Sequence, residues 1–298
     1  MELRVLRYFL AVCREGSISH AAESLHLTQP TLSRQIAEME RELGCELLSR
    51  EGRRLVPTEK GALLRRRAAE LVALAEQAER EMRASDEQLE GVVRIAAGES
   101  WVMEGIARAM GSFRDEHPAV SFAVHSGNAE DVSWRLDRGL ADFAVFMSNP
   151  RIEDYDHMRL PQTDAWGLLM PEGHPLSEKD AIGPEDLAGV GILVSERTLG
   201  AAPLASWLGG MRDKLDVAGT YTLAFNAAML VRAGVGCALV LDRIVQTGPG
   251  TGLELRLLYP PVVSFVDFAW KRYEPLSPAA EGFLKELGGS MRKAPSAE

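Results

Sequence analysis

Residues 16–36, GSISHAAESLHLTQPTLSRQI, contain two short helical patterns separated by a short turn. Ser17 stands where it can cap the first helix, and Thr28 stands where it can cap the second, whose first turn contains Pro30. Gly44 is placed to end the second helix. The apolar residues of the second helix recur at helical spacing and predict a buried stripe of Leu32, Ile36, Met39 and Leu43. The stretch therefore predicts a helix-turn-helix.

The flanking sequence completes a small domain. Upstream, apolar residues recur at helical spacing from Leu3 to Cys13, and Gly16 is placed to end this helix. Downstream, residues 47–58, LLSREGRRLVPT, predict a two-stranded hairpin with a basic tip. Three helices followed by such a hairpin predict a winged helix-turn-helix domain over residues 1–58.

The third helix of the domain is the second helix of the helix-turn-helix. Its exposed face and the hairpin carry residue types that contact DNA. Glutamine and arginine side chains hydrogen-bond to base edges in the major groove, and hydroxyl groups bind phosphates. Arginines in the hairpin can contact the backbone or the minor groove. The alternative is a protein-interaction module whose polar faces are simply solvated. The candidate DNA-binding residues are Ser19, Gln29, Pro30, Thr31, Ser33, Arg34, Gln35, Arg50, Arg53 and Arg54.

The distribution of charge is compatible with this interpretation, although the formal net charge of −10 disfavours a nucleic-acid partner at first sight. Residues 1–67 contain 12 Lys and Arg against 9 Asp and Glu, which gives +3. Residues 68–90 carry −5 and residues 91–298 carry −8, which we interpret as a solvated acidic surface. The acidic excess therefore lies outside the predicted DNA-binding segment.

The N-terminal motifs resemble the winged helix of LysR-type transcriptional regulators over residues 6–9, 16–22, 25–36 and 42–44. The resemblance implies that Gln29, Thr31, Ser33, Arg34 and Gln35 face DNA and that Arg50, Arg53 and Arg54 belong to the wing. Leu48 departs from the family, which usually has phenylalanine there. The resemblance also implies a homotetramer that is built as a dimer of dimers.

A long helix is predicted to follow the wing. It begins at Thr58 and Glu59, and neither glycine nor proline interrupts residues 62–90. Heptad spacing predicts that two copies of residues 59–90 pair, with packing on the chain's own C-terminal domain as the alternative. A dimer presents two recognition helices to the two halves of a pseudo-palindromic site on double-stranded DNA. The candidate dimerisation residues are Leu64, Ala68, Leu71, Ala75, Ala78 and Met82.

Residues 91–298 alternate between strand and helix patterns, which is typical of an α/β domain with mainly parallel sheets. A connection near Pro161–Asp164 separates two sets of elements, and the last strand and helix are expected to return to the first set. We therefore predict lobe I over residues 91–162 and 268–298 and lobe II over residues 163–267. This region resembles the LysR-type effector-binding domain, which implies a fold similar to periplasmic binding proteins.

Ligands in such folds lie at the carboxyl ends of strands and at helix N-termini. Ser100 and Trp101 open a helix, where a hydroxyl and free N–H groups can receive an anion. Trp101 and Phe146 favour an aromatic or apolar part in the ligand, whereas Glu196 opposes a purely anionic one. The candidate effector-binding residues are Ser100, Trp101, Gly127, Asn128, Phe146, Met147, Ser195, Glu196, Phe225 and Asn226.

The sequence contains no organised catalytic, metal or cofactor motif. It lacks a Gly-x-Ser-x-Gly elbow, a P-loop and a dinucleotide-binding glycine motif. The three cysteines are far apart, which predicts neither a disulfide framework nor a metal site. No apolar run is long enough to span a membrane and no signal sequence is evident, so we expect a cytoplasmic protein.

These observations predict an α/β protein with a winged helix-turn-helix, a linker helix and a two-lobed effector domain. Its predicted function is sequence-specific DNA binding in transcription regulation, controlled by a small-molecule effector, without enzymatic activity. The alternative is an architectural DNA-binding protein whose C-terminal domain only assembles the oligomer.

Overall fold

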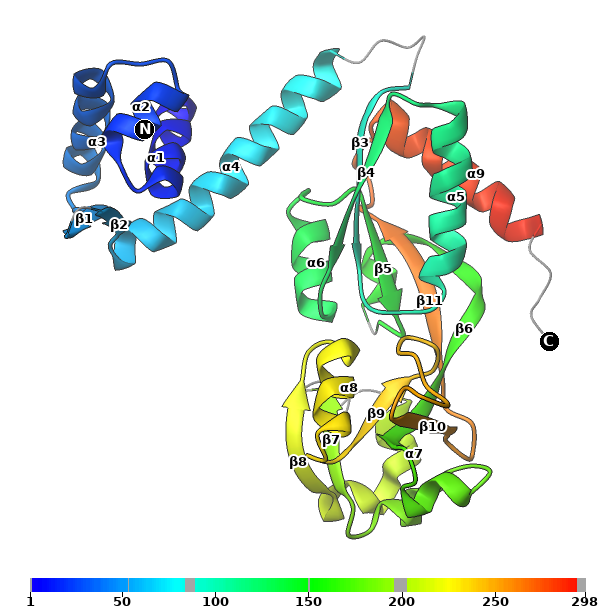
Figure 1. The fold of residues 1–298 in the computed structure, drawn as a ribbon. Coiled ribbons are helices and arrows are strands. Elements are labelled where there is room, and N and C mark those ends of the chain that lie inside the picture. Colours follow the sequence, from blue (N-terminus) through cyan, green and yellow to red (C-terminus); the bar gives the residue numbers. More distant parts are fainter. Residues whose placement is uncertain (1, 53, 84–88, 150, 196–202, 294–298) are drawn as a thin grey trace. The chain divides into compact units, whose positions relative to one another are not determined.

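The computed structural model describes residues 2–52, 54–83, 89–149, 151–195 and 203–293. The chain forms two compact units, Met1–Arg83 and Ala84–Glu298, and each is described by itself (Figure 1). Of residues 77, 80–83 and 292–293 only the backbone is described.

The first unit contains three helices, a hairpin and a long helix. Its elements are α1 (Leu3–Glu15), α2 (Ile18–Ser24), α3 (Gln29–Leu43), β1 (Leu48–Glu51), β2 (Arg54–Pro57) and α4 (Glu59–Arg83). The Ser17 hydroxyl accepts a hydrogen bond from the His20 N–H at the start of α2. Gly16 and Gly44 end α1 and α3 with φ angles of 63°, in the left-handed region that glycine adopts without strain. The predicted helix-turn-helix and hairpin are confirmed.

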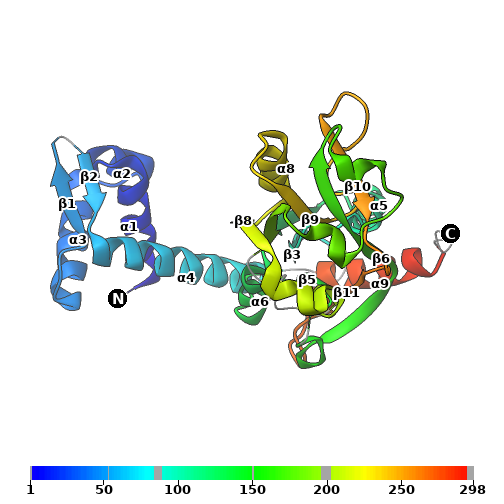
Figure 2. The same ribbon diagram turned by 90° about the horizontal axis from the view of Figure 1, so that it is seen from below.

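The core of the first unit lies where α1, α2 and α3 meet the start of α4, as both views show (Figures 1 and 2). Phe9, Leu32 and Ile36 are buried there. The prediction that Leu43 is buried is wrong, because its side chain is 42% exposed. Leu43 lies in the last turn of α3, one turn beyond Met39, and is not part of the core cluster.

The second unit is built on a single nine-stranded sheet. Its strands are β3 (Gly91–Ala97), β4 (Val120–Ser126), β5 (Phe143–Met147), β6 (Asp156–Pro171), β7 (Gly191–Ser195), β8 (Asp216–Tyr221), β9 (Cys237–Leu241), β10 (Leu253–Leu257) and β11 (Val263–Trp270). Their order is β4-β3-β5-β11-β6-β9-β7-β8, with β10 paired to β6. The helices are α5 (Met103–Glu116), α6 (Ala129–Asp137), α7 (Leu204–Leu208), α8 (Ala224–Arg232) and α9 (Pro278–Lys293).

The expectation of mainly parallel sheets is wrong, because the sheet is mixed. The pairs β3–β4, β3–β5, β7–β8 and β7–β9 are parallel. In contrast, β6 is antiparallel to β9, β10 and β11, and β11 is antiparallel to β5. The two strands that join the lobes, β6 and β11, therefore reverse the direction of the sheet at its centre (Figure 1).

The predicted connection at Pro161–Asp164 is also wrong, because these residues lie inside the 16-residue strand β6. The pairing of β6 with β11 shifts register between Phe265 and Asp267, where Thr163 and Arg159 are the partners. Pro161 therefore lies in a bulge, where its missing N–H removes no regular ladder bond. Strand β10 has no counterpart in the sequence prediction.

In each lobe, helices cover both faces of the sheet. In lobe I, Val93 and Ile95 pack with α5 and α9, whereas Ala96, Ala144 and Phe146 pack with α6. In lobe II, α7 and α8 cover opposite faces in the same way. The carboxyl ends of β3, β5 and β7 face the junction of the two lobes (Figure 1).

Candidate functional site

The N-terminal half of α3 presents a polar surface. Gln29, Pro30, Thr31 and Arg34 are exposed, and Ser33 and Gln35 are half-buried. Leu32 and Ile36 hold the opposite side of the helix in the core. The predicted recognition residues therefore share an accessible face whose orientation is fixed by packing.

Glu38 organises two of these residues. Its Oε1 accepts a hydrogen bond from Arg34 Nε at 3.0 Å, and its Oε2 accepts one from Gln35 Nε2 at 3.2 Å. The side chain of Arg34 is nevertheless 78% exposed. The guanidinium group is thus held on the helix surface while remaining accessible to a partner.

The wing is tied to the helices by hydrogen bonds. Leu55 N–H donates to the Gly16 carbonyl at 2.9 Å. Glu40 Oε1 accepts from the N–H groups of Leu47 and Leu48 at 2.7 and 3.2 Å. Sequence reasoning did not identify Glu40, which fixes the start of the hairpin relative to the recognition helix.

The remaining predicted DNA-binding residues are at the periphery of the first unit. Arg50 and Arg54 are exposed on the hairpin, and Ser19 is exposed on α2. Arg53 lies outside the described residues.

The candidate dimerisation residues on α4 fall into two groups. Ala68 is fully buried and Leu64 is half-buried in the core of the first unit. These two residues therefore lie on the side of α4 that packs against α1. Leu71 is 46% exposed, Ala75 is half-buried and Ala78 is exposed. The side chain of Met82 lies outside the described residues.

Two further leucines, Leu63 and Leu74, are 50% and 45% exposed on α4. Helical geometry places both on the same side as Leu71 and Ala78, next to the stripe that packs on α1. The unpaired apolar face of α4 therefore contains Leu63 and Leu74 in addition to Leu71 and Ala78.

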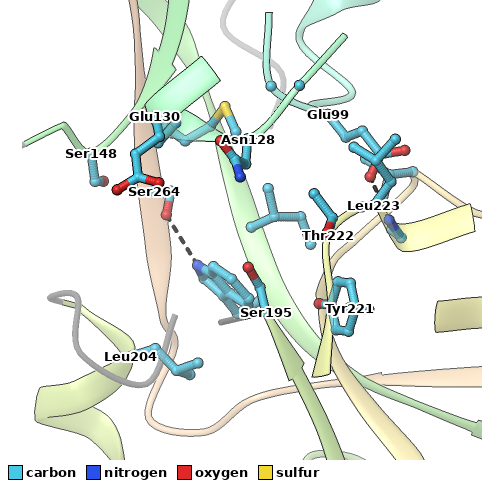
Figure 3. Close-up of a pocket in the computed structure, with 18 of the residues that line it drawn as sticks. Glu99, Asn128, Glu130, Ser148, Ser195, Leu204, Tyr221, Thr222, Leu223 and Ser264 are labelled. Atoms are coloured by element: carbon cyan, nitrogen blue, oxygen red, sulfur yellow. Dashed lines mark hydrogen bonds between the residues drawn. The ribbon is translucent and has the colours of Figure 1, made fainter. Parts of the chain in front are cut away.

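A cavity of about 450 Å³ lies between the lobes of the second unit (Figure 3). Lobe I contributes the loop after β3, the start of α6 and the end of β5, and lobe II contributes the ends of β7 and β8 and the start of α8. The crossing strands contribute Trp166 and Ser264, whose side chains are joined by a 3.0 Å hydrogen bond from the indole N–H to the hydroxyl. The volume of the cavity suits a small molecule.

Four of the predicted effector-binding residues line this cavity, namely Gly127, Asn128, Met147 and Ser195. Ser100 and Trp101 instead line a neighbouring open pocket, together with Glu99 and Arg243. Glu196 lies outside the described residues.

Three predicted contacts are not part of the cavity. Phe146 is buried in the layer under α6, with its ring centroid 5.5 Å from that of Tyr155, because alternate residues of β5 face opposite sides. Phe225 and Asn226 are exposed on α8, which begins one residue before Phe225, and neither lines the cavity.

Backbone N–H groups at the helix N-termini around the cavity and the neighbouring pocket already donate hydrogen bonds to acceptors within the chain. The Ser100 hydroxyl accepts from the Val102 N–H at 3.1 Å, and Asp164 Oδ1 accepts from the Trp101 N–H at 3.3 Å. At α6, Asn128 Oδ1 accepts from the Asp131 N–H at 2.9 Å. The expectation that free N–H groups near Ser100 receive an anion is therefore wrong.

Across the cavity, lobe I and lobe II are joined by Glu99. Its Oε2 accepts a hydrogen bond from the Ala224 N–H, at the first residue of α8 (Figure 3). Burial raises the pKa of Tyr221 above its ordinary value, and the negative charge of Glu99 raises it further. Glu99 and Tyr221 both line the cavity.

Asp164 is a completely buried carboxyl group in the middle of β6. Burial raises its pKa from the ordinary 3.8 to about 6, the hydrogen bonds from Ser100 and Trp101 oppose this, and the charge of Asp242 adds to it. Its Oδ2 has no hydrogen-bond partner among the described residues. Asp164 pairs in register with Ser264, which lines the cavity.

Sequence reasoning missed Glu99, Glu130, Trp166, Tyr221, Thr222 and Ser264, which also line the cavity. Glu99 precedes Ser100 in the loop after a strand, so the same loop argument could have included it. Trp166 and Ser264 lie within crossing strands and carried no such signal.

Neither a metal site nor a membrane span is found in the part of the chain that the structure describes. No group of three His, Cys, Asp or Glu side chains is placed to hold a metal ion there. No described helix is both long and apolar enough to cross a membrane. Burial raises the pKa of Cys13 and of Cys237 to about 11, which disfavours a reactive thiolate at either position.

A winged helix-turn-helix unit followed by a two-lobed α/β unit defines a class of bacterial DNA-binding transcriptional regulators. The chain belongs to the LysR family of this class: residues 3–62 match the "bacterial regulatory helix-turn-helix protein, lysR family" and residues 86–292 match the "LysR substrate binding domain". The family predicted from the sequence motifs is confirmed.

Curated relatives match different shares of the chain. A "Probable RuBisCO transcriptional regulator" of Cyanophora paradoxa is 32% identical over 62% of this chain, and the match spans only 58% of that relative. The "RuBisCO operon transcriptional regulator" of Allochromatium vinosum is 30% identical over 95% of this chain and 94% of its own length. The regulator YybE of Bacillus subtilis is 26% identical over 95% of this chain and 97% of its own.

Solved structures show the same fold. The LysR family regulator CbnR superposes with a TM-score of 0.74 and 19% identity, covering 98% of this chain and 99% of CbnR. HinK, a LysR family regulator from Pseudomonas aeruginosa, has a TM-score of 0.55 and 20% identity, covering 98% of both chains. The predicted architecture is confirmed at this level.

Proposed function

We propose that this LysR-family regulator binds pseudo-palindromic sites on double-stranded DNA as a homodimer or a tetramer, and that a small-molecule effector in the interlobe cavity controls the bound state. The accessible polar face of α3 supports this proposal most directly. It combines Gln29, Thr31 and Arg34 on a helix whose other side is fixed in a core. Such a helix fits the major groove, where arginine and glutamine read base edges.

We assign residues 1–58 to DNA binding, 59–90 to the linker helix and 91–298 to effector binding. Within the last segment, lobe I comprises residues 91–162 and 268–298, and lobe II comprises residues 163–267. Because its proposed target is double-stranded DNA and no described helix could cross a membrane, the protein is proposed to act in the cytoplasm.

Pairing through α4 is supported by its exposed apolar residues. Leu63, Leu71 and Leu74 leave substantial apolar surface in water in an isolated chain. Covering this surface with a second copy stabilises the pair and presents two recognition helices together. A solved complex, that of full-length CbnR with its target DNA, has the same chain fold.

The cavity favours an effector-controlled regulator over a purely architectural protein. Both lobes and both crossing strands line it, so a bound molecule contacts elements whose relative positions can change. An effector shifts the equilibrium between two arrangements only by its difference in affinity for them. DNA bending involves roughly 1–6 kcal/mol, which a modest affinity difference can supply.

We propose that the cavity binds its ligand without chemical turnover. Its described lining contains no histidine, cysteine or lysine, so its serine hydroxyls have no such base beside them among the described lining residues, and the carboxylate of Glu99 is bound to the Ala224 N–H. Incubating the purified protein with any ligand that stabilises it should leave that ligand chemically unchanged.

The DNA-binding proposal is tested by selecting bound genomic fragments and measuring their affinity in gel-shift assays. Arg34→Ala should weaken binding to the selected fragment by roughly 5- to 150-fold, since a specific base contact contributes ~1–3 kcal/mol. Arg41→Ala is the matched control, because Arg41 is also exposed on α3 but lies in its last turn. Equal affinities of the two variants would contradict the assignment of the recognition face.

A further inference from the structure

We propose that Glu38 sets which bases the recognition helix α3 reads, because it holds the side chains of Arg34 and Gln35 in fixed orientations. Glu38 is a positioning residue that acts through these two side chains rather than on the DNA itself. The inference rests on the DNA-binding function proposed above and specifies how two of the assigned residues discriminate between bases.

One carboxylate contacts both side chains. Glu38 Oε1 accepts a hydrogen bond from Arg34 Nε at 3.0 Å, and Oε2 accepts one from Gln35 Nε2 at 3.2 Å. Residues three and four positions apart are neighbours on a helix surface, so the three side chains share one face of α3. Leu32 and Ile36 are buried on the other side of the helix. Because each carboxylate oxygen binds a different side chain, Arg34 and Gln35 are oriented together.

The contact with Glu38 decides which donors of Arg34 face outward. A guanidinium group carries five N–H donors in a rigid planar fork. Glu38 binds Nε, so the edge formed by the two Nη groups lies at the outer end of a side chain that is 78% exposed. Two parallel N–H donors of this kind match O6 and N7 of guanine. We therefore expect Arg34 to read guanine.

The contact with Glu38 also decides the orientation of the Gln35 amide. An ionised carboxylate accepts hydrogen bonds and donates none, so the amide turns its NH2 group toward Oε2 and its oxygen away from Glu38. In the major groove such an oxygen accepts from the exocyclic amine of adenine or cytosine, whereas O6 of guanine and O4 of thymine are themselves acceptors. We therefore expect Gln35 to select adenine or cytosine.

The charge of Glu38 indicates a role in specificity rather than in affinity. A carboxylate on a DNA-binding face is repelled by phosphates, and it partly compensates the positive charge of Arg34. Glu38 Oε1 also lies 3.9 Å from Arg41 Nη2, so it offsets a second cation of the same helix. These effects weaken binding to every duplex, whatever its sequence. A side chain that opposes binding in general but orients two base readers increases the difference between correct and incorrect sites.

The bases bound by the unmodified full-length protein test these expectations first. A site is selected from a random duplex library, and the affinity of each single-base variant is measured by fluorescence anisotropy at fixed salt. The position that each residue reads is the one where Arg34→Ala or Gln35→Ala abolishes discrimination. We expect guanine at the Arg34 position and adenine or cytosine at the Gln35 position.

Base analogues then identify the contacted strand and atom. Replacing adenine by 2-aminopurine, or cytosine by 2-pyrimidinone, removes the amine from the major groove. At the Gln35 position this should weaken binding of the unmodified protein about five-fold or more. The same replacement should have no effect on Gln35→Ala, which lacks the oxygen that accepts the amine.

Glu38→Gln gives the sharpest test, because a structural role alone would not reverse a base preference. The new amide oxygen accepts the charged Arg34 Nε, so its NH2 group faces Gln35 and the Gln35 amide turns over. The outward group of Gln35 is then a donor. The preferred base at the Gln35 position should change from adenine or cytosine to guanine or thymine on the same strand, with guanine retained at the Arg34 position.

Two further variants separate orientation from charge. Glu38→Ala removes both contacts, so discrimination at both positions should fall about five-fold or more while affinity for an unrelated duplex rises. Glu42→Gln is the matched control, because Glu42 is exposed on α3 one turn beyond Glu38. It removes the same charge and should leave both base preferences as they are.

The outcomes separate this inference from the proposed function. If removal of the amine has no effect on the unmodified protein, or if Glu38→Gln keeps the original base at the Gln35 position, the role of Glu38 is overturned while DNA binding by α3 stands. The analogue measurement decides this even if a variant does not fold. If no defined site is selected, or if neither Arg34→Ala nor Gln35→Ala alters discrimination, the recognition face and this inference fail together.

Discussion

Replacing Asp164 by asparagine should stabilise the second unit at neutral and alkaline pH. The carboxyl is completely buried, and burial raises its pKa from 3.8 to about 6. The asparagine amide keeps an oxygen for the Trp101 N–H, which now donates to Asp164 Oδ1 at 3.3 Å. It removes a charge that the buried site disfavours.

The sign and size of the effect follow from proton linkage. In the unfolded chain this carboxyl ionises near pH 3.8, so between pH 3.8 and 6 the folded state binds more protons than the unfolded state. The contribution of Asp164 to the free energy of unfolding is therefore greatest below pH 3.8 and is lost as the pH rises through 6. The loss amounts to about 3 kcal/mol at pH 8.

Urea unfolding followed by tryptophan fluorescence measures this quantity in the full-length protein. All five tryptophans lie beyond residue 90, so the signal reports on the second unit. Asp164→Asn should raise the free energy of unfolding by up to about 3 kcal/mol at pH 8 and by less than about 1 kcal/mol at pH 4, where the folded protein holds Asp164 neutral. A shift of roughly 2–4 °C in Tm per kcal/mol gives a second measure.

Asp267→Asn is the control of opposite sign. Asp267 is also buried, but Arg159 donates to its two oxygens from Nε and Nη2 at 2.9 and 3.2 Å. Neutralising it removes a bidentate ion pair and should destabilise the unit. If Asp164→Asn destabilised the protein at pH 8 as Asp267→Asn does, the reasoning about desolvation would be refuted.

Three further substitutions test the interfaces and the cores. Leu71→Glu places a charge on the exposed apolar face of α4, so sedimentation velocity should show a smaller species, and an unchanged profile would argue against pairing there. Phe283→Ala removes a fully buried ring from lobe I and should lower the free energy of unfolding by about 3–5 kcal/mol in the fluorescence assay. Gly61→Ala would drive a methyl group into the Leu47 carbonyl oxygen, and helical circular dichroism should show a lower Tm for the first unit; an unchanged Tm would mean that the backbone relaxes there freely.

The winged helix could be predicted in detail because its signals are local. Pro30 and Gly44 mark the first turn and the end of α3, and each acts within one turn of the helix. Thr28 occupies the N-cap position, but its hydroxyl bonds to the Thr31 hydroxyl and makes no cap hydrogen bond to the backbone. The exposure of Leu43 could not be predicted, because it depends on where the neighbouring helices stop rather than on the period of α3.

The division of α4 between two partners was also beyond the heptad pattern. Apolar residues at heptad spacing predict that one stripe is buried, but they do not indicate which partner buries it. Ala68 packs within its own unit, whereas Leu71 remains exposed one turn further along. Only the position of α1 distinguishes the two residues.

Prediction of the cavity was limited by long-range strand pairing. The loop residues Gly127, Asn128 and Ser195 were identified because each follows a strand. Trp166 and Ser264 meet because β6 and β11 pair antiparallel, and Pro161 concealed the continuity of β6. The partners of the helix N-termini, such as Glu99 for Ala224, lie 125 residues apart and have no signature in the sequence.

The uninterrupted passage of β6 and β11 through both lobes limits the motions available to the second unit. Residues 156–171 form one strand, and its hydrogen-bonded neighbour β11 runs beside it between the lobes. A wide swinging motion of one lobe would break main-chain hydrogen bonds along both strands at once. We expect rotation of the lobes to be absorbed as a small change in strand twist near the register shift between Phe265 and Asp267. We therefore expect a ligand to change the second unit through a slight torsion along its central strands, rather than through the opening and closing of a hinge.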